Sequence, residues 1–304
     1  MNFEIRQMNY SRLANHRLMF ADAVEKAMKF TRPVIISYRT LDSTVVSSCA
    51  SFVMLNREGW MVTAGHVFDS MTRLNDDAEK IRQANADNAD GTEHVKMDPK
   101  WVTNQSFWWG WDGVTIKNVY INREIDVAIG KLEPFNPDWI LEYPVMKDPN
   151  AMRPGTSLCR IGFPFTKSTT DFSEKTQTFH IREGVLPMPF FPNDCIHTRN
   201  IYMGRSSDGY DMSYIETSTP GMRGQSGGPI FDRSCKIAGI QVKTAHLPLG
   251  FHPTIRKPNG EVVVENQFIN VGLGVHVRTL TEMLDSLSVK YTSETKDRGF
   301  RVND

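Results

Sequence analysis

The sequence predicts an all-β fold, a mostly antiparallel barrel or sandwich. Short runs rich in β-branched and aromatic residues recur along the 304 residues, and turn-forming segments such as "LDST" and "NREG" separate them. Helical periodicity is limited to three segments. The 35 basic and 35 acidic residues cancel, so no charge excess points to a nucleic acid or an anionic membrane as partner.

The three predicted helices lie near the ends and early in the chain. Apolar residues at helical intervals predict a helix over 8–30, which Pro33 ends because the residue before a proline is pushed toward extended geometry. A second helix is predicted over 70–86 and a closing amphipathic helix over 279–287. The polar tail from 291 is expected to be loose.

The predicted strands are short and occur in two groups on either side of residue 145. In chain order they are "PVIISYRT", "VVSSCASFVML", "GWMVTAGHVF", "DGVTIKNVYI", "DVAIGKLE", "SLCRIGFPF", "TFHIREGVL", "DMSYIETST", "KIAGIQVKTA" and "QFINVGLGVHV". Many short strands at close spacing favour one or two barrels over a layered α/β fold.

The stretch "GMRGQSGGPIFD", residues 221–232, surrounds Ser226 with four glycines and a proline. One interpretation is a surface turn, which is what most clusters of glycine, serine and proline form. The other is a loop that presents Ser226 as a nucleophile beside backbone N–H groups able to hold an oxyanion. The stretch alone leaves both open.

Two further residues could complete a nucleophilic site. Of the eight histidines, His66 alone follows a strongly apolar strand and sits between small residues, in "GWMVTAGHVF". Asp126 heads the apolar run "DVAIGKLE", where a carboxylate is costly unless it is hydrogen-bonded. Taken singly, His66 could simply end a strand and Asp126 could simply accept backbone N–H groups.

Taken together, "TAGHV", "DVAIGKL" and "GQSGGPIF" occur in the order His, Asp, Ser, and they resemble the three signatures of the chymotrypsin-like (trypsin-like) serine peptidases. The resemblance is closer to bacterial HtrA/Deg-type and V8-like domains and extends over roughly residues 33–288, through "RIGFPF" and "GLGVHVRTLTEMLDSL". The α/β-hydrolase elbow also reads G-x-S-x-G, but it needs a helix after the serine, and Pro229 with the following β pattern excludes one.

This resemblance implies a fold of two six-stranded antiparallel β-barrels with an N-terminal helix and a C-terminal helix. The implied division is a helical extension over 1–32, a first barrel over 33–145, a second barrel with its closing helix over 146–290, and a tail over 291–304. The first barrel would carry His66 and Asp126, and the second would carry Ser226.

The implied function is a serine endopeptidase acting on a protein or peptide substrate, with no cofactor and no metal. Ser226 would attack a peptide carbonyl, His66 would transfer the proton, and Asp126 would orient the imidazole. The N–H groups of Gly224 and Ser226 would form the oxyanion hole. A catalytically silent barrel that only binds a protein stays open as the alternative.

The resemblance also implies the residues that bind substrate: Thr219, Pro220, Gly221, Met222, Val242, Lys243, Thr244, Gly272 and Gly274. Pro220 stands where trypsin has an aspartate, so cleavage after lysine or arginine is not expected. Gly272 and Gly274 would leave the primary pocket open and neutral. Residues 242–244 would pair with the substrate backbone, and Lys243 either favours an acidic residue further from the cut or is simply solvated.

Compartment and control follow from what the sequence lacks. It has no apolar leader and no run of about 20 apolar residues, so a cytoplasmic enzyme is expected. The four widely spaced cysteines are expected to be free thiols in or near strands. Gln225 replaces the aspartate that trypsin-type enzymes use for activation, and no PDZ domain is expected to follow.

The aromatic cluster "FWWGWDG" stands in an insertion over 70–120. Its residues Phe107, Trp108, Trp109 and Trp111 are expected to pack as a flap, and the helix over 8–30 is expected to pack on a barrel. The alternative is that both elements contact an activating protein partner that corrects the oxyanion loop.

Overall fold

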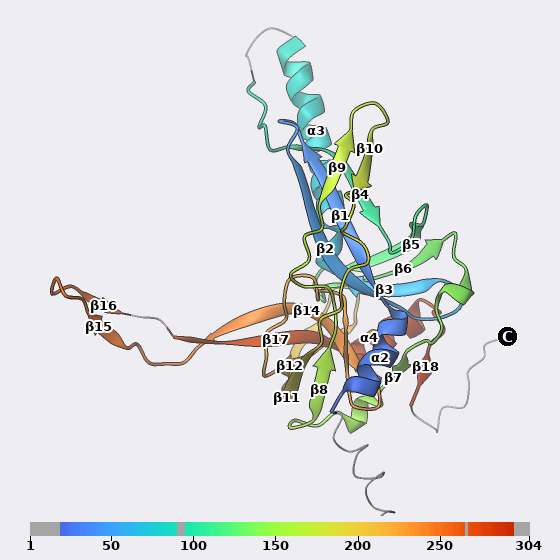
Figure 1. The fold of residues 1–304 in the computed structure, drawn as a ribbon, viewed down its shortest axis with the longest axis vertical. Helices are drawn as coiled ribbons and strands as arrows, with labels where there is room; N and C mark the ends of the chain where they lie inside the picture. The colour runs from blue at the N-terminus through green and yellow to red at the C-terminus, as the bar shows by residue number, and fades with distance from the viewer. Residues whose placement is uncertain (1–18, 90–94, 265–266, 295–304) are drawn as a thin grey trace, which may run out of the picture.

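The computed structural model describes residues 19–89, 95–264 and 267–294. Most strands lie in two large sheets, one formed before residue 134 and the other after residue 144 (Figure 1). The pairings are antiparallel except for those of two short strands in the second sheet. The predicted mostly β fold with helices toward both ends is confirmed.

The first sheet has six strands in the order β4-β1-β2-β3-β6-β5. Their bounds are β1 Thr31–Thr40, β2 Val45–Met54, β3 Trp60–Ala64, β4 Val102–Trp108, β5 Thr115–Asn122 and β6 Val127–Glu133. The outer strands β4 and β5 do not pair with each other in the described residues, so the sheet stays open. At its centre β3 and the start of β6 are almost wholly buried, because both of their faces are covered.

The second sheet closes on itself. Its order is β13-β8-β11-β12-β17-β14-β7-β18, and β13 also pairs with β14, so six of these strands form a ring. Their bounds are β7 Val145–Met146, β8 Ser157–Arg160, β11 Asn193–Arg205, β12 Asp211–Thr217, β13 Pro229–Phe231, β14 Lys236–Pro248, β17 Phe268–His276 and β18 Thr292–Ser293. The tail expected to be loose from 291 therefore contains a strand, because Thr292 and Ser293 pair with β7; residues 295–304 lie outside the described part.

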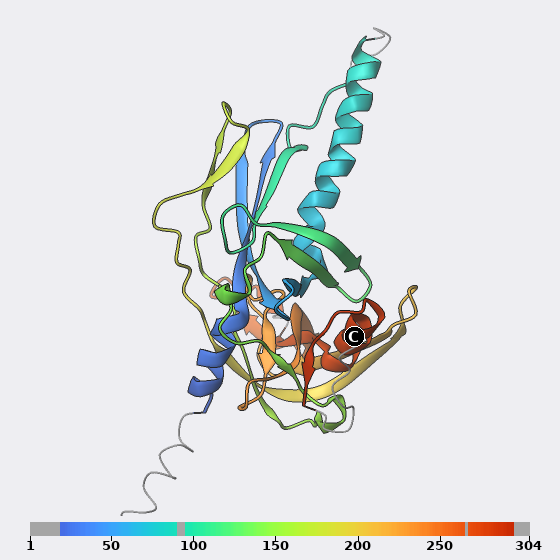
Figure 2. The same cartoon turned by 90° about the vertical axis from the view of Figure 1, so that its right-hand side faces the viewer.

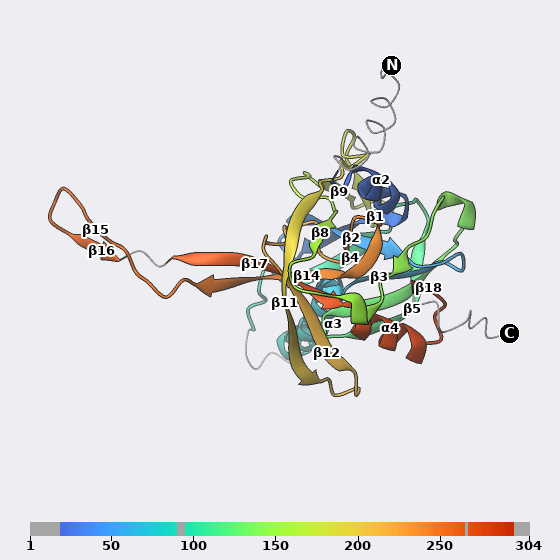
Figure 3. The ribbon, with the colours of Figure 1, turned by 90° about the horizontal axis from the view of Figure 1, so that it is seen from below.

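Two small hairpins complete the β structure. One joins β9 (Thr170–Ser173) to β10 (Thr178–Ile181), and the other joins β15 (Thr254–Arg256) to β16 (Val262–Val264). The second lies at the end of an arm, built by the outer parts of β14 and β17, that extends away from the rest of the molecule (Figures 1 and 3). The arm exposes apolar side chains, including Phe251 and Phe268.

All three predicted helices are present, with bounds that differ from the predicted ones. Helix α2 (Ala21–Phe30) ends where β1 begins, and the part of this helix expected over 8–18 lies outside the described residues. Helix α3 spans Asp69–Ala89, and most of its length projects from the body (Figure 2). Helix α4 (Val277–Ser286) buries one face and begins at His276, whose Nδ1 accepts a hydrogen bond from the N–H of Arg278. Short 3-10 turns occupy Gly65–Phe68, Pro137–Trp139 and Pro149–Ala151.

Two long strands were not predicted. β4, "VTNQSFW", and β11, "NDCIHTRNIYMGR", contain too many polar residues to show a clear alternation. They form because neighbouring strands supply hydrogen bonds: β4 pairs with β1, while β11 lies between β8 and β12. Strand formation by a polar segment is thus decided by tertiary pairing rather than by local preference.

The aromatic cluster packs, as predicted. Trp109 is buried, with its ring 5.5 Å from that of Phe52 and 5.8 Å from that of Phe68. Trp111 stacks on Trp139 at 5.1 Å. Helix α2 packs likewise, with Ala23, Ala27 and Phe30 in the core.

The four cysteines are free thiols, as predicted. Cys49, Cys159 and Cys195 lie in strands, and Cys235 directly precedes β14. Burial raises the pKa of Cys49, Cys159 and Cys235 to about 12, which leaves almost no thiolate at neutral pH.

We therefore expect the folded protein to be indifferent to redox conditions. Cys159, Cys195 and Cys235 should resist alkylation by iodoacetamide until the protein is unfolded, because the thiolate is the reactive form and these thiols are buried. Mass spectrometry before and after denaturation measures this. An intact disulfide in the native protein would contradict it.

No helix in the described part of the chain is long and apolar enough to cross a membrane.

Candidate active site

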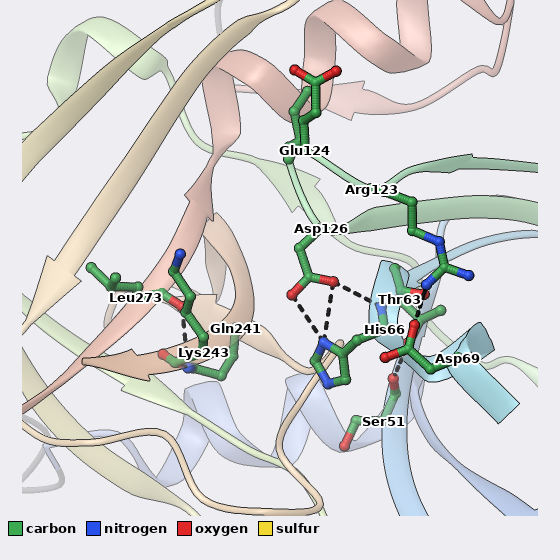
Figure 4. A network of polar contacts seen from close by, with 12 residues as sticks. Ser51, Thr63, His66, Asp69, Arg123, Glu124, Asp126, Gln241, Lys243 and Leu273 are labelled. Carbon is green, nitrogen blue, oxygen red and sulfur yellow. Dashed lines mark hydrogen bonds and ion pairs between the residues drawn. The ribbon is translucent and has the colours of Figure 1, made fainter. Parts of the chain in front are cut away.

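His66 and Asp126 meet in a direct pair between the two sheets (Figure 4). His66 Nδ1 lies 2.9 Å from Asp126 Oδ2 and 3.1 Å from Asp126 Oδ1. The backbone N–H of His66 also donates to Asp126 Oδ1 at 2.8 Å. The carboxylate therefore fixes both the backbone and the ring of the histidine, and it leaves Nε2 without a partner in the described residues.

Local structure brings this pair together. His66 lies in the 3-10 turn that follows β3, and Asp126 immediately precedes β6, the neighbour of β3 in the sheet. Asp126 has a φ of 68°, a left-handed conformation that aspartate tolerates better than most residues. Gly65 allows the approach, because a side chain there would crowd the carboxylate and backbone of Asp126.

The pair has the electrostatics of an oriented base. The hydrogen bond that the His66 ring donates to Asp126 raises the pKa of His66 above its ordinary value of 6.5, although burial of the ring acts in the opposite direction. The His66 side chain keeps 40% of its exposure and Asp126 keeps 25%, so a molecule bound at the surface can reach the imidazole. Such an imidazole can accept a proton on Nε2.

The Ser226 loop is anchored to the first sheet by Ser51 of β2. The N–H of Ser51 donates to the carbonyl of Ser226 at 2.8 Å, and its hydroxyl donates to the carbonyl of Gly224 at 2.7 Å. Gly227 then packs so closely that a side chain would collide with Ser51 and Thr63. Thr63 is three residues before His66, so this contact brings the serine loop to the end of β3.

The N–H groups of Gly224 and Ser226 have no acceptor among the described residues, whereas their neighbours do. The N–H groups of Gln225, Gly227 and Gly228 donate to Met222, Gln241 and Gln225 in turn. Gly224 has a φ of 95°, which only glycine adopts readily, and its carbonyl accepts from Phe163 at 3.0 Å. Two free donors at alternate positions are what an oxyanion hole requires.

Gln225 shapes this loop from inside. Its side chain is fully buried, and its Oε1 accepts from the N–H of Met222 at 3.0 Å. The amide of Gln225 thus stands where, by the resemblance, trypsin-type enzymes carry an aspartate. The loop is held by this bond without an ion pair.

Ser226 Oγ makes no hydrogen bond to His66 or to any other described residue. The third member of the predicted triad is therefore close to the pair through its loop but is not bonded to it. Catalytic hydrogen bonds are often long in proteins without substrate and shorten when substrate binds. The roles of His66, Asp126, Ser226 and Gly224 stay predictions.

The predicted substrate-binding residues gather around the closed barrel. Thr219, Pro220, Gly221 and Met222 precede the serine loop, Val242–Thr244 belong to β14, and Gly272 and Gly274 belong to β17. The pairing of β14 with β13 does not extend beyond Ile240. At residues 242–244, β14 therefore pairs with β17 on one side and with no strand of the described structure on the other. That free edge is suited to an added strand.

The expectation that two glycines leave the pocket open is corrected. A side chain at Gly272 would collide with the guanidinium of Arg160, and one at Gly274 would collide with Ile230. Side chains therefore already fill the space beside both glycines. Arg160 also makes this region cationic instead of neutral.

A cavity of about 310 Å³ lies beside the pair and is lined by His66, Asp69, Arg123, Glu124, Ile125, Asp126, Tyr214, Val242 and Lys243. Its charged groups are mixed: Arg123 pairs with Asp69, while Glu124 points away from His66 (Figure 4). Lys243 is exposed and its Nζ lies 5.8 Å from the centre of the Tyr214 ring. This exposure favours the solvated interpretation of Lys243.

Sequence reasoning missed the residues that hold the site. Tyr214 of β12 donates to the carbonyls of Glu124 and Ile125, each at 3.2 Å, and so fixes the turn before Asp126 from the second sheet. The side chain of Asn122 holds the same turn, because its Oδ1 accepts a hydrogen bond from the N–H of Ile125 at 2.8 Å. Neither residue has a motif around it, because each acts through the backbone of a distant or neighbouring segment.

The two sheets and the histidine–aspartate pair at their junction define a chymotrypsin-like fold. The family model described as "Trypsin-like peptidase domain" matches residues 49–240. The chain belongs to this family, and the resemblance drawn from the sequence is confirmed. Comparison with curated protein sequences gives no match.

Solved structures with this fold include HtrA-type proteases. The HtrA-type protease AlgW with a decapeptide is 16% identical, with a TM-score of 0.50, over 88% of this chain and 67% of that one. AlgW with a tripeptide is 17% identical, with a TM-score of 0.47, over 89% of this chain and 63% of that one. The active form of the Rv3671c protease from M. tuberculosis is 12% identical, with a TM-score of 0.48, over 89% and 86%. This chain spans about two thirds of the length of the AlgW chains.

Proposed function

We propose that this protein is a serine endopeptidase that hydrolyses peptide bonds of a protein substrate through Ser226, His66 and Asp126. The observation that carries the proposal is the pair of His66 and Asp126 at 2.9 Å, set beside a serine loop in which two N–H groups have no acceptor among the described residues. Membership of the trypsin-like peptidase family supports it.

The steps follow from the positions of these groups. Ser226 Oγ attacks the substrate carbonyl carbon while His66 Nε2 takes the hydroxyl proton. The N–H groups of Gly224 and Ser226 hold the oxyanion that forms, and such a donor is typically worth about 3 kcal/mol. His66 then gives the proton to the leaving amine, and water releases the acyl group by the same proton transfers.

Asp126 keeps the proton of the neutral imidazole on Nδ1, so that Nε2 is the free base. It also stabilises the imidazolium formed during attack. A substrate segment that pairs with the free edge of β14 at Val242–Thr244 would hold its carbonyl near Ser226. An activating protein partner stays a prediction.

The proposal is tested by incubating the purified protein with a peptide library and identifying new termini by mass spectrometry. We expect internal bonds to be cut by the wild-type protein, with no cuts by Ser226→Ala prepared in parallel. A library left intact by the wild-type protein would overturn the proposal.

A second candidate is a catalytically silent barrel that binds a protein segment. The missing hydrogen bond between Ser226 and His66 favours it. It predicts that the wild-type protein retains library peptides without cutting them, and that Ser226→Ala binds them equally well.

The raised pKa of His66 gives a pH prediction for the enzyme. The imidazole must be neutral to accept a proton, so kcat/KM should rise with pH with a midpoint above 6.5. In Asp126→Asn the cause of the raised pKa is removed, so the midpoint should fall, and kcat should drop by about 10⁴-fold. Rates measured on one peptide from pH 5 to 9 test both effects. Equal midpoints in the two proteins would contradict the assignment of Asp126.

A further inference from the structure

Arg160 is a completely buried cation in the second barrel. It comes from the last position of β8. Its Nη1 donates to Gln241 Oε1 at 2.7 Å, and its Nη2 donates to Thr217 Oγ1 at 2.5 Å and to the carbonyl of Thr219 at 3.0 Å. The guanidinium therefore lies between β8, β12 and β14, under the segment that leads into the Ser226 loop.

All of these partners are neutral. In the described residues Arg160 forms no ion pair with a carboxylate, although Arg199, one strand away, pairs with buried Glu216. Arg160 Nε is buried and has no hydrogen-bond partner in the part of the chain that the structure describes. Burying an unpaired guanidinium is costly, and natural proteins seldom keep one unless a negative group joins it.

The guanidinium lies where the primary specificity pocket is expected. Thr219 and Gly272 both belong to the residues predicted to line that pocket, and a side chain at Gly272 would collide with Arg160 Nη1. Gln241, which orients Nη1, fills the space beside Gly221 in the same way. Gly272 thus leaves room for the guanidinium of Arg160 in the region where this pocket is expected.

We infer that Arg160 is the specificity-determining residue of this site and that it selects an acidic side chain, glutamate or aspartate, immediately before the bond that is cut. This inference rests on the proposed function. The substrate carboxylate would replace the neutral acceptors and accept two N–H groups from the planar guanidinium, which is the geometry that arginine offers best. An amide of the same shape would leave the charge unpaired, so the pocket rejects it.

The test uses two peptides that differ only by glutamate or glutamine before the cut bond. For the wild-type protein we expect kcat/KM to be about 10- to 100-fold higher for the glutamate peptide. Arg160→Gln should reduce that ratio to about one, and Arg160→Lys, which keeps a charge, should retain part of it. Arg153→Gln makes the same charge change at an exposed position and should leave the ratio unchanged.

Equal rates for the two peptides in the wild-type protein, or an unchanged ratio in folded Arg160→Gln, would overturn the inference and leave the proposed function standing. If Arg160→Gln does not fold, the inference is judged by the ratio of kcat/KM for the two peptides in the wild-type protein and in Arg160→Lys.

If neither peptide is cut, the proposed function fails, and fluorescence anisotropy with Ser226→Ala decides the inference separately. Tighter binding of the glutamate peptide than of the glutamine peptide supports the role of Arg160. Equal binding overturns it.

Discussion

Ser226→Ala is expected to lower kcat by about 10⁶-fold while the protein stays folded. The loss is large because the nucleophile itself is removed. The fold is spared because Ser226 Oγ has no hydrogen bond within the described residues, so its removal leaves no buried partner unsatisfied. His66→Ala should cost about as much, since members of a triad act as a unit.

The wild-type protein and the two variants are compared by their cleavage rates on one peptide and by their free energies of unfolding in urea. Ser234→Ala removes an exposed hydroxyl near the start of β14 and is the matched control; it should keep the wild-type rate. The free energy of unfolding of Ser226→Ala should stay within about 0.5 kcal/mol of the wild type. Undiminished cleavage by Ser226→Ala or by His66→Ala would contradict the mechanism.

Gly227→Ala is the second change with a large expected effect. Gly227 has a φ of 81°, and a β-carbon there would collide with the carbonyl of Ser51 and the hydroxyl of Thr63. The loop must then move away from the first sheet, and Ser226 moves with it. We expect at least about a 100-fold loss of kcat/KM, because a misplacement of about 1 Å costs that much.

Gly155→Ala is the control that separates the two effects of Gly227→Ala, the steric collision and the strain of a left-handed backbone. Gly155 has a φ of 87°, but a β-carbon there would meet nothing within 4 Å. It should lose about 1–2 kcal/mol of stability from the left-handed backbone alone and keep its kcat/KM. Gly227→Ala should lose more stability, since crowding adds about 1–3 kcal/mol. Equal losses of stability and rate in the two variants would show that the contact with Ser51 and Thr63 does not position Ser226.

The sequence was sufficient to predict those parts of the candidate site that lie in contiguous motifs. "TAGHV", "DVAIGKL" and "GQSGGPIF" each combine an apolar strand with one reactive residue, and the fold brings the first two into contact as expected. The mostly β architecture was predictable because the hydrophobic pattern of apolar strands can be recognised in the sequence without knowing which strands they pair with. Polar strands such as β11 have no such period, and only their neighbours in the sheet define them.

The burial of Arg160 could not be predicted for a related reason. Arg160 lies 66 residues before Ser226 in the motif "RIGFPF" region, where nothing in its neighbours marks a buried cation. The hydrogen bonds of Arg160 depend on Thr217, Thr219 and Gln241, which belong to two other segments of the chain. Gly272 predicts open space from the glycine alone, because a sequence does not say which side chain fills the space that a glycine leaves; here the Arg160 guanidinium lies beside it.

Peptide mapping of the protein after reaction with a fluorophosphonate tests most directly whether Ser226 is an activated nucleophile. A serine hydroxyl attacks phosphorus readily only where a base accepts its proton and an oxyanion site stabilises the product. The account predicts one phosphonyl adduct, on Ser226, that forms far more slowly in His66→Ala. No adduct on the folded protein, or an adduct on another residue, would contradict it.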